Sequence, residues 1–121
     1  MNYLLDTHIL IWWAEDNKKL SPSFKELIAD SANDIYISVA SVWEVEIKTK
    51  LKKIKLKTPI EKIVDKYGFN YLDIKLNHIL KLKHLKDYHK DPFDRILISQ
   101  SISEKMTLLT DDKIIRKYFE H

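Results

Sequence analysis

Short hydrophobic runs alternate with longer amphipathic segments along the whole chain. The short runs are rich in β-branched, leucine or aromatic residues and predict strands at residues 3–5, 34–39, 71–74 and 107–110. The longer segments have the spacing of helices, and they cover residues 7–15, 21–30, 40–51, 58–68, 75–86, 91–105 and 112–119. Because strands and helices alternate, we predict a parallel sheet that is covered on both faces.

Two of the predicted helices carry an apolar stripe. In the helix after the second strand, Ala40, Ile47 and Leu51 share one face, and Glu44 projects from the edge of this stripe. In the helix over residues 75–86, the apolar set is Leu76, Ile79, Leu80 and Leu82. Both stripes are expected to pack against the rest of the protein.

The order of elements predicts an α/β fold, a three-layer sandwich whose central, mainly parallel sheet has four to five strands. A chain of 121 residues suits one domain over residues 1–121, and 45% hydrophobic residues are enough for its core. Cysteine is absent, which excludes disulfides, thiolate zinc sites and cysteine nucleophiles. The apolar N-terminal stretch is too short to span a membrane and lacks the features of a signal peptide, so a soluble cytoplasmic protein is expected.

The charged residues of the chain bear on what it could bind. The formal net charge of +3 permits contact with nucleic acid. Lysines crowd two stretches, residues 48–57 and residues 81–90. Each stretch is interpreted either as ordinary solvated charge or as a surface that holds a polyanion.

Acidic residues follow most of the predicted strands. Asp6 ends the first strand, Glu44 lies in the helix after the second, and Asp112 follows the fourth. Asp91 and Asp94 stand at the start of the helix that precedes the fourth strand. Taken singly, each has a structural explanation: a helix cap for the aspartates, and a surface position for Glu44.

As a set, these acids predict a metal site. The carboxyl ends of parallel strands meet at one edge of a sheet, so we expect Asp6, Glu44, Asp94 and Asp112 to converge there. Four unpaired carboxylates repel one another and require a cation. Because all are hard oxygen ligands, they favour Mg²⁺ or Mn²⁺ over zinc, as one ion or two. Such a site suits phosphate chemistry.

Four blocks of the sequence resemble PIN-domain toxins of the VapC type, in the family's order and over nearly the whole chain. They are residues 4–12, 41–48, 89–100 and 108–112, and the third, which begins His-Lys-Asp-Pro-Phe-Asp-Arg, is the most specific. The resemblance implies a PIN-like fold and an endoribonuclease that uses Mg²⁺ or Mn²⁺ as the toxin of a type II toxin–antitoxin system. It further implies an RNA substrate, a homodimer, and a cognate antitoxin whose C-terminal segment lies over the active site.

The resemblance also assigns the acids. Asp6, Glu44 and Asp94 match the three central acids of the family. The fourth family position stands two places after a threonine, which selects Asp112 over Asp111. These four residues are therefore expected both to bind the metal and to be catalytic.

Other residues are expected to support the site. Asp91 matches an additional acid of the subgroup, and Thr110 is expected to orient a ligand or a water near the metal. Arg95 is expected either to contact substrate phosphate or to pair with a carboxylate. His8 is expected to be packed in the first turn of its helix, with contact to the substrate as the alternative. The three tryptophans, Trp12, Trp13 and Trp43, are expected in the core or a dimer interface rather than as platforms for base stacking.

Three alternatives have different sequence requirements. A phospho-receiver switch module has a similar α/β order, but it places two acids at the end of its first strand. In this chain Asp6 has no acidic neighbour at that position. A phosphatase of the haloacid dehalogenase type needs a second aspartate at the position of His8. A catalytically inactive nucleic-acid-binding or partner-binding domain would not need the complete set of acids.

Overall fold

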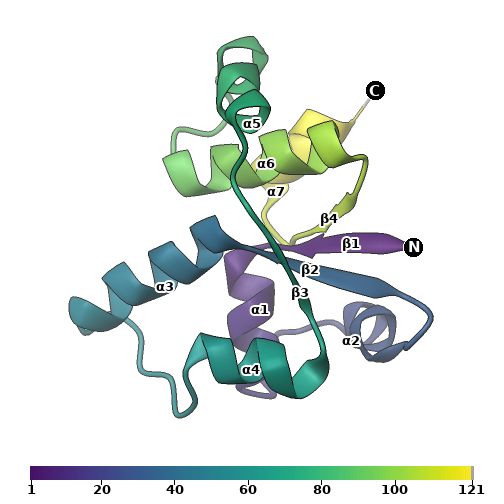
Figure 1. The fold of residues 1–121 in the computed structure, drawn as a ribbon, viewed down its shortest axis with the longest axis vertical. Helices are drawn as coiled ribbons and strands as arrows, with labels where there is room; N and C mark the ends of the chain where they lie inside the picture. The colour runs from purple at the N-terminus through teal and green to yellow at the C-terminus, as the bar shows by residue number, and fades with distance from the viewer. Residues whose placement is uncertain (121) are drawn as a thin grey trace.

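In a computed structural model that describes residues 1–120, four strands form one sheet between two layers of helices (Figure 1). The strands are β1 (Asn2–Leu5), β2 (Asp34–Ser38), β3 (Asn70–Leu72) and β4 (Thr107–Leu109). They lie in the order β3-β2-β1-β4, and every pair is parallel. The predicted α/β sandwich is confirmed, with four strands. His121, the last residue of the predicted domain, lies outside the described residues.

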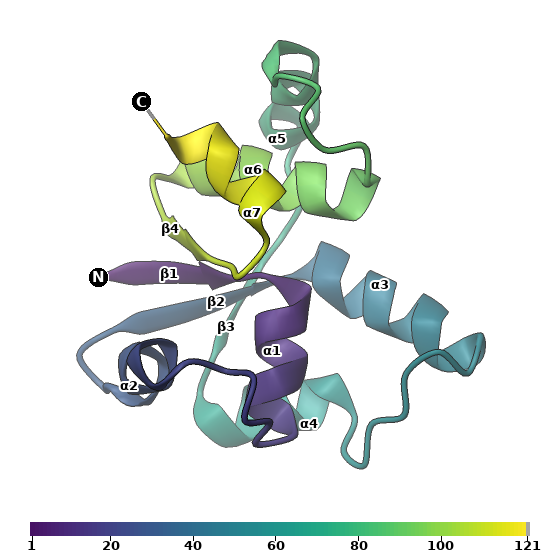
Figure 2. The same ribbon diagram turned by 180° about the vertical axis from the view of Figure 1, so that it is seen from behind.

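The helical segments alternate with the strands as predicted. They are α1 (Thr7–Ala14), α2 (Pro22–Ala29), α3 (Val39–Lys50), α4 (Ile60–Tyr67), α5 (Leu76–Leu80), α6 (Pro92–Glu104) and α7 (Lys113–Arg116), with 3₁₀ turns η1 (Lys81–His84) and η2 (Lys117–Phe119). Helices α1, α2 and α4 cover one face of the sheet, and α6 and α7 cover the other (Figures 1 and 2). Within residues 1–120, the helices are too short or too polar to cross a membrane.

Local sequence signals account for several helix ends. The Ser21 side chain accepts a hydrogen bond from the backbone N–H of Phe24, and Pro22 occupies the first position of α2. Gly68 ends α4 with a φ of 67°, in the left-handed region that glycine adopts without strain.

The strands are buried on both faces, as a parallel sheet between helices requires. Along β1, Tyr3 and Leu5 join the core beneath α1, α2 and α4, whereas Leu4 joins the core beneath α6 and α7. The same alternation recurs in β4, where Leu108 and Leu109 belong to opposite cores. Each strand therefore positions the residue that follows it through packing on two sides.

The strand order creates a switch point beside β1. The chain runs from β1 outward through β2 to β3, and then returns to place β4 on the other side of β1. At this point the backbone N–H of Asp6 donates to the carbonyl of Leu109, over 3.0 Å, and continues the pairing of β1 with β4. In open parallel sheets, ligands bind beyond the strand ends at such a point.

Three elements differ from the sequence prediction. The third strand was predicted over residues 71–74 but covers Asn70–Leu72, because Leu72 pairs with Ser38, the last residue of β2. The helix predicted over residues 75–86 is α-helical only from Leu76 to Leu80 and then tightens into η1. Similarly, the closing helix over residues 112–119 consists of α7 followed by η2.

The two predicted apolar stripes are buried only in part, by Ala40 in the first and by the half-buried Leu82 in the second. On α3, Ala40 is buried, but Ile47 and Leu51 are exposed, because the C-terminal half of the helix extends beyond the sheet (Figure 1). On α5, Leu76, Ile79 and Leu80 are exposed, since α5 packs on α6 and η1 rather than on the sheet. The buried side chain of α5 is His78, which contacts Glu104 of α6 at 2.8 Å.

Candidate metal centre

Asp6 lies at the centre of the switch point, directly after β1. Its side chain is 2% exposed, and it makes no capping hydrogen bond to α1. Instead, Asp6 Oδ2 accepts a hydrogen bond from Thr110 Oγ1 at 2.8 Å. Burial raises the pKa of Asp6 above its usual value, although the bond from Thr110 acts in the opposite direction. A helix cap therefore does not explain this carboxylate.

Glu44 points into the protein from the second turn of α3. It is 4% exposed, so the surface position considered from sequence is wrong. The helix is fixed here because Ser38 caps its start and Ser41 accepts a buried hydrogen bond from Thr7 at 2.9 Å. Glu44 Oε2 pairs with Lys48 Nζ one turn later, at 2.8 Å. This hydrogen bond raises the pKa of Lys48, with further contributions from Asp91 and Asp94.

Asp91 and Asp94 stand at the start of α6 but have different environments. Asp91 Oδ1 accepts from the backbone N–H groups of Phe93 and Asp94, so it caps the helix as its position before Pro92 predicts. Asp94 projects toward the other acids. Burial, together with the charges of Asp6 and Asp91, raises the pKa of Asp94 to about 7. Asp94 is therefore an acid whose charged form is disfavoured first by burial and then by the neighbouring acids.

Asp112 completes the group from the start of α7. Its Oδ1 accepts from the backbone N–H groups of Ile114 and Ile115, and its own backbone N–H donates to Thr110 Oγ1 at 3.1 Å. Burial opposes the ionisation of Asp112, but these N–H groups and His89 outweigh it and lower its pKa. Thr110 thus connects Asp6 to Asp112, and the exposed Asp111 lies outside this network.

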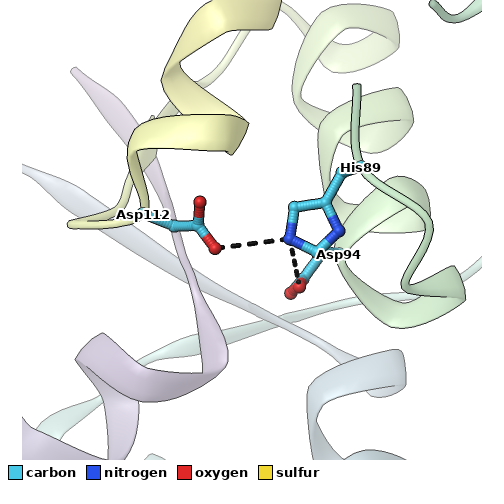
Figure 3. A group of neighbouring side chains, drawn as sticks. All are labelled: His89, Asp94 and Asp112. Carbon is cyan, nitrogen blue, oxygen red and sulfur yellow. Dashed lines mark hydrogen bonds and ion pairs between the residues drawn. The ribbon is translucent and has the colours of Figure 1, made fainter. Parts of the chain in front are cut away.

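His89 is a member of the site that sequence reasoning did not assign. Its Nε2 lies 3.1 Å from Asp94 Oδ2 and 3.3 Å from Asp112 Oδ2, between the two carboxylates (Figure 3). One ligand atom from each of the three residues lies within 4.8 Å of the others. His89 belongs to the most specific sequence block, two residues before Asp91, and this position was its only signal.

The donor set fits a divalent cation. Among residues 1–120, Asp6 Oδ1 and Glu44 Oε1 are buried oxygens that have no hydrogen-bond partner. A buried carboxylate oxygen without a partner is costly, and a cation would satisfy both. Hard carboxylate oxygens are ligands that Mg²⁺ and Mn²⁺ accept. The structure thus brings together Asp6, Glu44, Asp94 and Asp112, with Asp91 and Thr110 at their edge.

Arg95 faces away from the carboxylates of the cluster. Its guanidinium donates to the backbone carbonyls of Leu82, Lys86 and His89, over 3.0 to 3.1 Å. Its carboxylate neighbour is Asp87, at 3.7 Å. These contacts hold the segment before α6 in place.

His8 differs from its expected environment, and Trp43 lies outside the core of the single chain, so its place in a dimer interface stays a prediction. His8 is exposed rather than packed, with its ring 6.2 Å from that of Trp12. Trp43 is 61% exposed in the described chain and contacts Phe93 edge-on, with ring centroids 5.2 Å apart. Trp12 and Trp13 are half-buried and pack against the core below the sheet.

Comparisons with known proteins identify the family and the fold of the chain. A family model described as PIN domain matches residues 3–120. Ribonuclease VapC22 of Mycobacterium tuberculosis is 20% identical over 118 residues, which are 95% of this chain and 90% of that protein. The crystal structure of VapBC2 from Rickettsia felis, bound to a DNA fragment from its promoter, contains a chain of the same fold. The two chains superpose with a TM-score of 0.69 and are 21% identical in sequence. The match covers 98% of the present chain and 93% of the chain in that crystal structure.

The crowding of the acids predicts that Asp94→Asn stabilises the metal-free protein. The pKa of Asp94 is about 7 when folded and near its usual 3.8 when unfolded, so its ionisation destabilises the fold as pH rises through this window. Each pKa unit of difference is worth about 1.4 kcal/mol. In EDTA at pH 8, we expect the Tm of Asp94→Asn to exceed that of the wild type by roughly 5 °C or more.

The Tm difference should shrink as the pH is lowered toward 5, where the wild-type carboxyl is already protonated when folded. Asp111→Asn is the matched control, because it removes one neighbouring exposed carboxylate and should give no such gain. A lower Tm for Asp94→Asn than for the wild type at pH 8 would show that the acids do not repel one another.

Proposed function

The chain belongs to the PIN-domain family, and from this we propose that it is a metal-dependent endoribonuclease of the VapC type. It acts as the toxin of a type II toxin–antitoxin system, and residues 1–121 serve as a single cytoplasmic nuclease domain. The observation that carries the proposal is the pair of buried, unpartnered oxygens of Asp6 and Glu44 within a cluster of acids at the switch point. Ribonuclease VapC22 is the named relative whose activity this proposal extends to the present chain.

In this function, Asp6, Glu44, Asp94 and Asp112 hold Mg²⁺ or Mn²⁺. When bound, the cation stabilises the negative charge that develops on the phosphodiester and makes water more acidic. Thr110 fixes the orientation of Asp6 through its 2.8 Å hydrogen bond. Asp91 keeps the first turn of α6 in place, and so sets the position of Asp94. These side chains provide the rigid, preorganised charge on which phosphoryl chemistry depends.

A lysine track, as we call it, covers the last turn of α3 and the loop that follows it. Lys48 lies at the acids through its contact with Glu44. Beyond it, Lys50, Lys52, Lys53, Lys55 and Lys57 are all exposed. Their charges would hold the phosphates of RNA while the acids hold the metal. This arrangement favours a polyanionic substrate over a small phosphate ester.

The proposal includes two protein partners. Partner-binding would use the exposed apolar side chains Leu76, Ile79 and Leu80 of α5, and Trp43, Ile47 and Leu51 of α3. Such side chains on neighbouring turns of a helix are typical of protein interfaces. One partner is a second copy of the chain in a homodimer. The other is a cognate antitoxin, as the structural neighbour VapBC2 is named for a two-component complex.

The two alternatives to a nuclease fit the site less well. A phospho-receiver needs a second acid beside Asp6, whereas Glu44 reaches the site from within a helix. An inactive binding domain gives no reason to keep two buried carboxylate oxygens without hydrogen bonds.

Replacement of Asp6 should abolish RNA cleavage. We expect Asp6→Asn to cleave a structured RNA at least about 100-fold more slowly in Mg²⁺. Removal of a residue that only orients a metal ligand already lowers activity by up to about this factor, and Asp6 is itself a proposed ligand. EDTA should stop the wild-type reaction. Asp111→Asn, which alters an exposed acid beside the site, should keep near wild-type activity. Cleavage that survives EDTA, or a wild-type rate in Asp6→Asn, would refute the proposed chemistry.

Removal of the lysine track should weaken RNA binding without changing the metal site. For the variant with Lys52, Lys53 and Lys55 replaced by alanine, the slope of log affinity against log salt should fall by up to about 3, if each lysine contacts one phosphate. The charge-matched control replaces the exposed Lys18, Lys19 and Lys62. Equal slopes in the two variants would show that the lysines of residues 50–57 are ordinary solvated surface charge and do not bind RNA.

A further inference from the structure

We propose that His89 is a positioning residue of the metal centre, which holds Asp112 through a hydrogen bond from its ring N–H and keeps Asp94 in contact with the same ring nitrogen. The inference rests on the proposed metal-dependent function and assigns a role to a residue outside the four acids. His89 contacts Asp94 of α6 and Asp112 at the start of α7, so its ring joins two elements that contribute separate acids (Figure 3).

The hydrogen bonds of the ring fix which nitrogen carries the proton. His89 Nδ1 accepts a hydrogen bond from the backbone N–H of Asp91 at 3.2 Å. A ring nitrogen that accepts a hydrogen bond has no proton, so the neutral imidazole carries its proton on Nε2. That hydrogen is donated to Asp112 Oδ2 at 3.3 Å, and Asp94 Oδ2 lies in contact with the same nitrogen at 3.1 Å.

The same tautomer argues against His89 as a metal ligand. A ligating nitrogen must present a lone pair, and the opposite ring N–H then usually donates to an oxygen. Here Nδ1 faces an N–H instead of an oxygen, so Nε2 is left as the donor. The carboxylate oxygens do not lose their capacity for a cation, because each can accept a hydrogen bond and still present a second lone pair.

The backbone of His89 is held on both sides. Its N–H donates to Tyr118 Oη at 2.8 Å, and its carbonyl accepts from Arg95 Nη1 at 3.0 Å. Tyr118 Oη also donates to the Lys86 carbonyl at 2.7 Å, and Arg95 bonds the Leu82 carbonyl at 3.1 Å. The position of the ring is therefore determined by α6 and η2, and Arg95 serves the site indirectly through His89.

Loss of the ring would remove the hydrogen-bond donor to Asp112 and the group that lies between Asp112 and Asp94. Asp112 Oδ1 is already occupied by the N–H groups of Ile114 and Ile115, so Oδ2 is the oxygen that His89 orients. Asp94 would retain the repulsion of Asp6 and Asp91 without its neighbouring imidazole. The carboxylates would move apart, and the affinity for a cation would fall.

The test is a titration with Mn²⁺ in which the free ion is followed by electron paramagnetic resonance. Removal of a group that orients metal ligands typically costs 10–100-fold in metal affinity. We expect His89→Ala and His89→Phe to bind Mn²⁺ about 10–100-fold more weakly than the wild type. His89→Gln, whose side-chain amide can donate to the same oxygens, should recover most of the affinity. His84→Ala removes an exposed histidine of η1 and is the matched control.

Pulsed paramagnetic resonance of the Mn²⁺-loaded wild type needs no variant and checks the role independently of folding. We expect no strong ¹⁴N coupling from an imidazole. If a strong ¹⁴N coupling is observed in the wild type and disappears in His89→Gln, His89 is a metal ligand and the proposal is overturned. Equal or tighter Mn²⁺ binding by His89→Ala would also overturn it, while leaving the nuclease proposal intact. A wild type that binds no Mn²⁺ would refute both.

Discussion

Electrostatic repulsion between carboxylates at one edge of the sheet is the constraint on which the site depends. The parallel strands and the return of the chain to β4 bring Asp6, Glu44, Asp94 and Asp112 together. The chain offsets part of this charge with its own side chains. Lys48 pairs with Glu44, and the His89 ring lies between Asp94 and Asp112. Two buried carboxylate oxygens, Asp6 Oδ1 and Glu44 Oε1, remain without a partner within residues 1–120, and they mark the place proposed for a cation.

Helix capping and metal binding need not exclude one another in this fold. Asp112 uses Oδ1 to cap α7 and directs Oδ2 toward His89 and the centre of the cluster. Asp91 uses its carboxylate to start α6, and that start fixes the direction of Asp94. Asp6 precedes a helix and makes no cap at all. The local rule for aspartate at a helix start therefore predicts where these residues stand, but only the tertiary structure shows which oxygen is free.

Much of this arrangement could be predicted from the sequence. The hydrophobic runs before Asp6 and Asp111 mark strands because both faces of a parallel sheet are buried, and the acids follow from their places after those strands. His89 was not predicted, because a histidine in a loop has no periodic signal. Lys48 could have been found as the lysine four residues after Glu44, a spacing that places the two side chains together on a helix.

The environment of the outlying helices could not be predicted from periodicity. An apolar stripe indicates that a helix buries one face, but it does not identify the partner. Ile47 and Leu51 lie where α3 extends past the sheet, and Leu76 lies on a helix stacked on α6. An apolar stripe normally lies on the side of a helix that packs on the core. In both of these helices the stripe faces outward in the single chain.

The most direct test of the metal centre is the anomalous scattering of Mn²⁺ in crystals of the protein. We expect a peak within bonding distance of Asp6 Oδ1 and Glu44 Oε1, the two buried carboxylate oxygens that have no hydrogen-bond partner in residues 1–120. That peak should be absent from crystals of Asp6→Asn grown under the same conditions. Full loading with Mn²⁺ elsewhere, and no peak at these two oxygens, would contradict the central claim that this cluster of acids is a metal site.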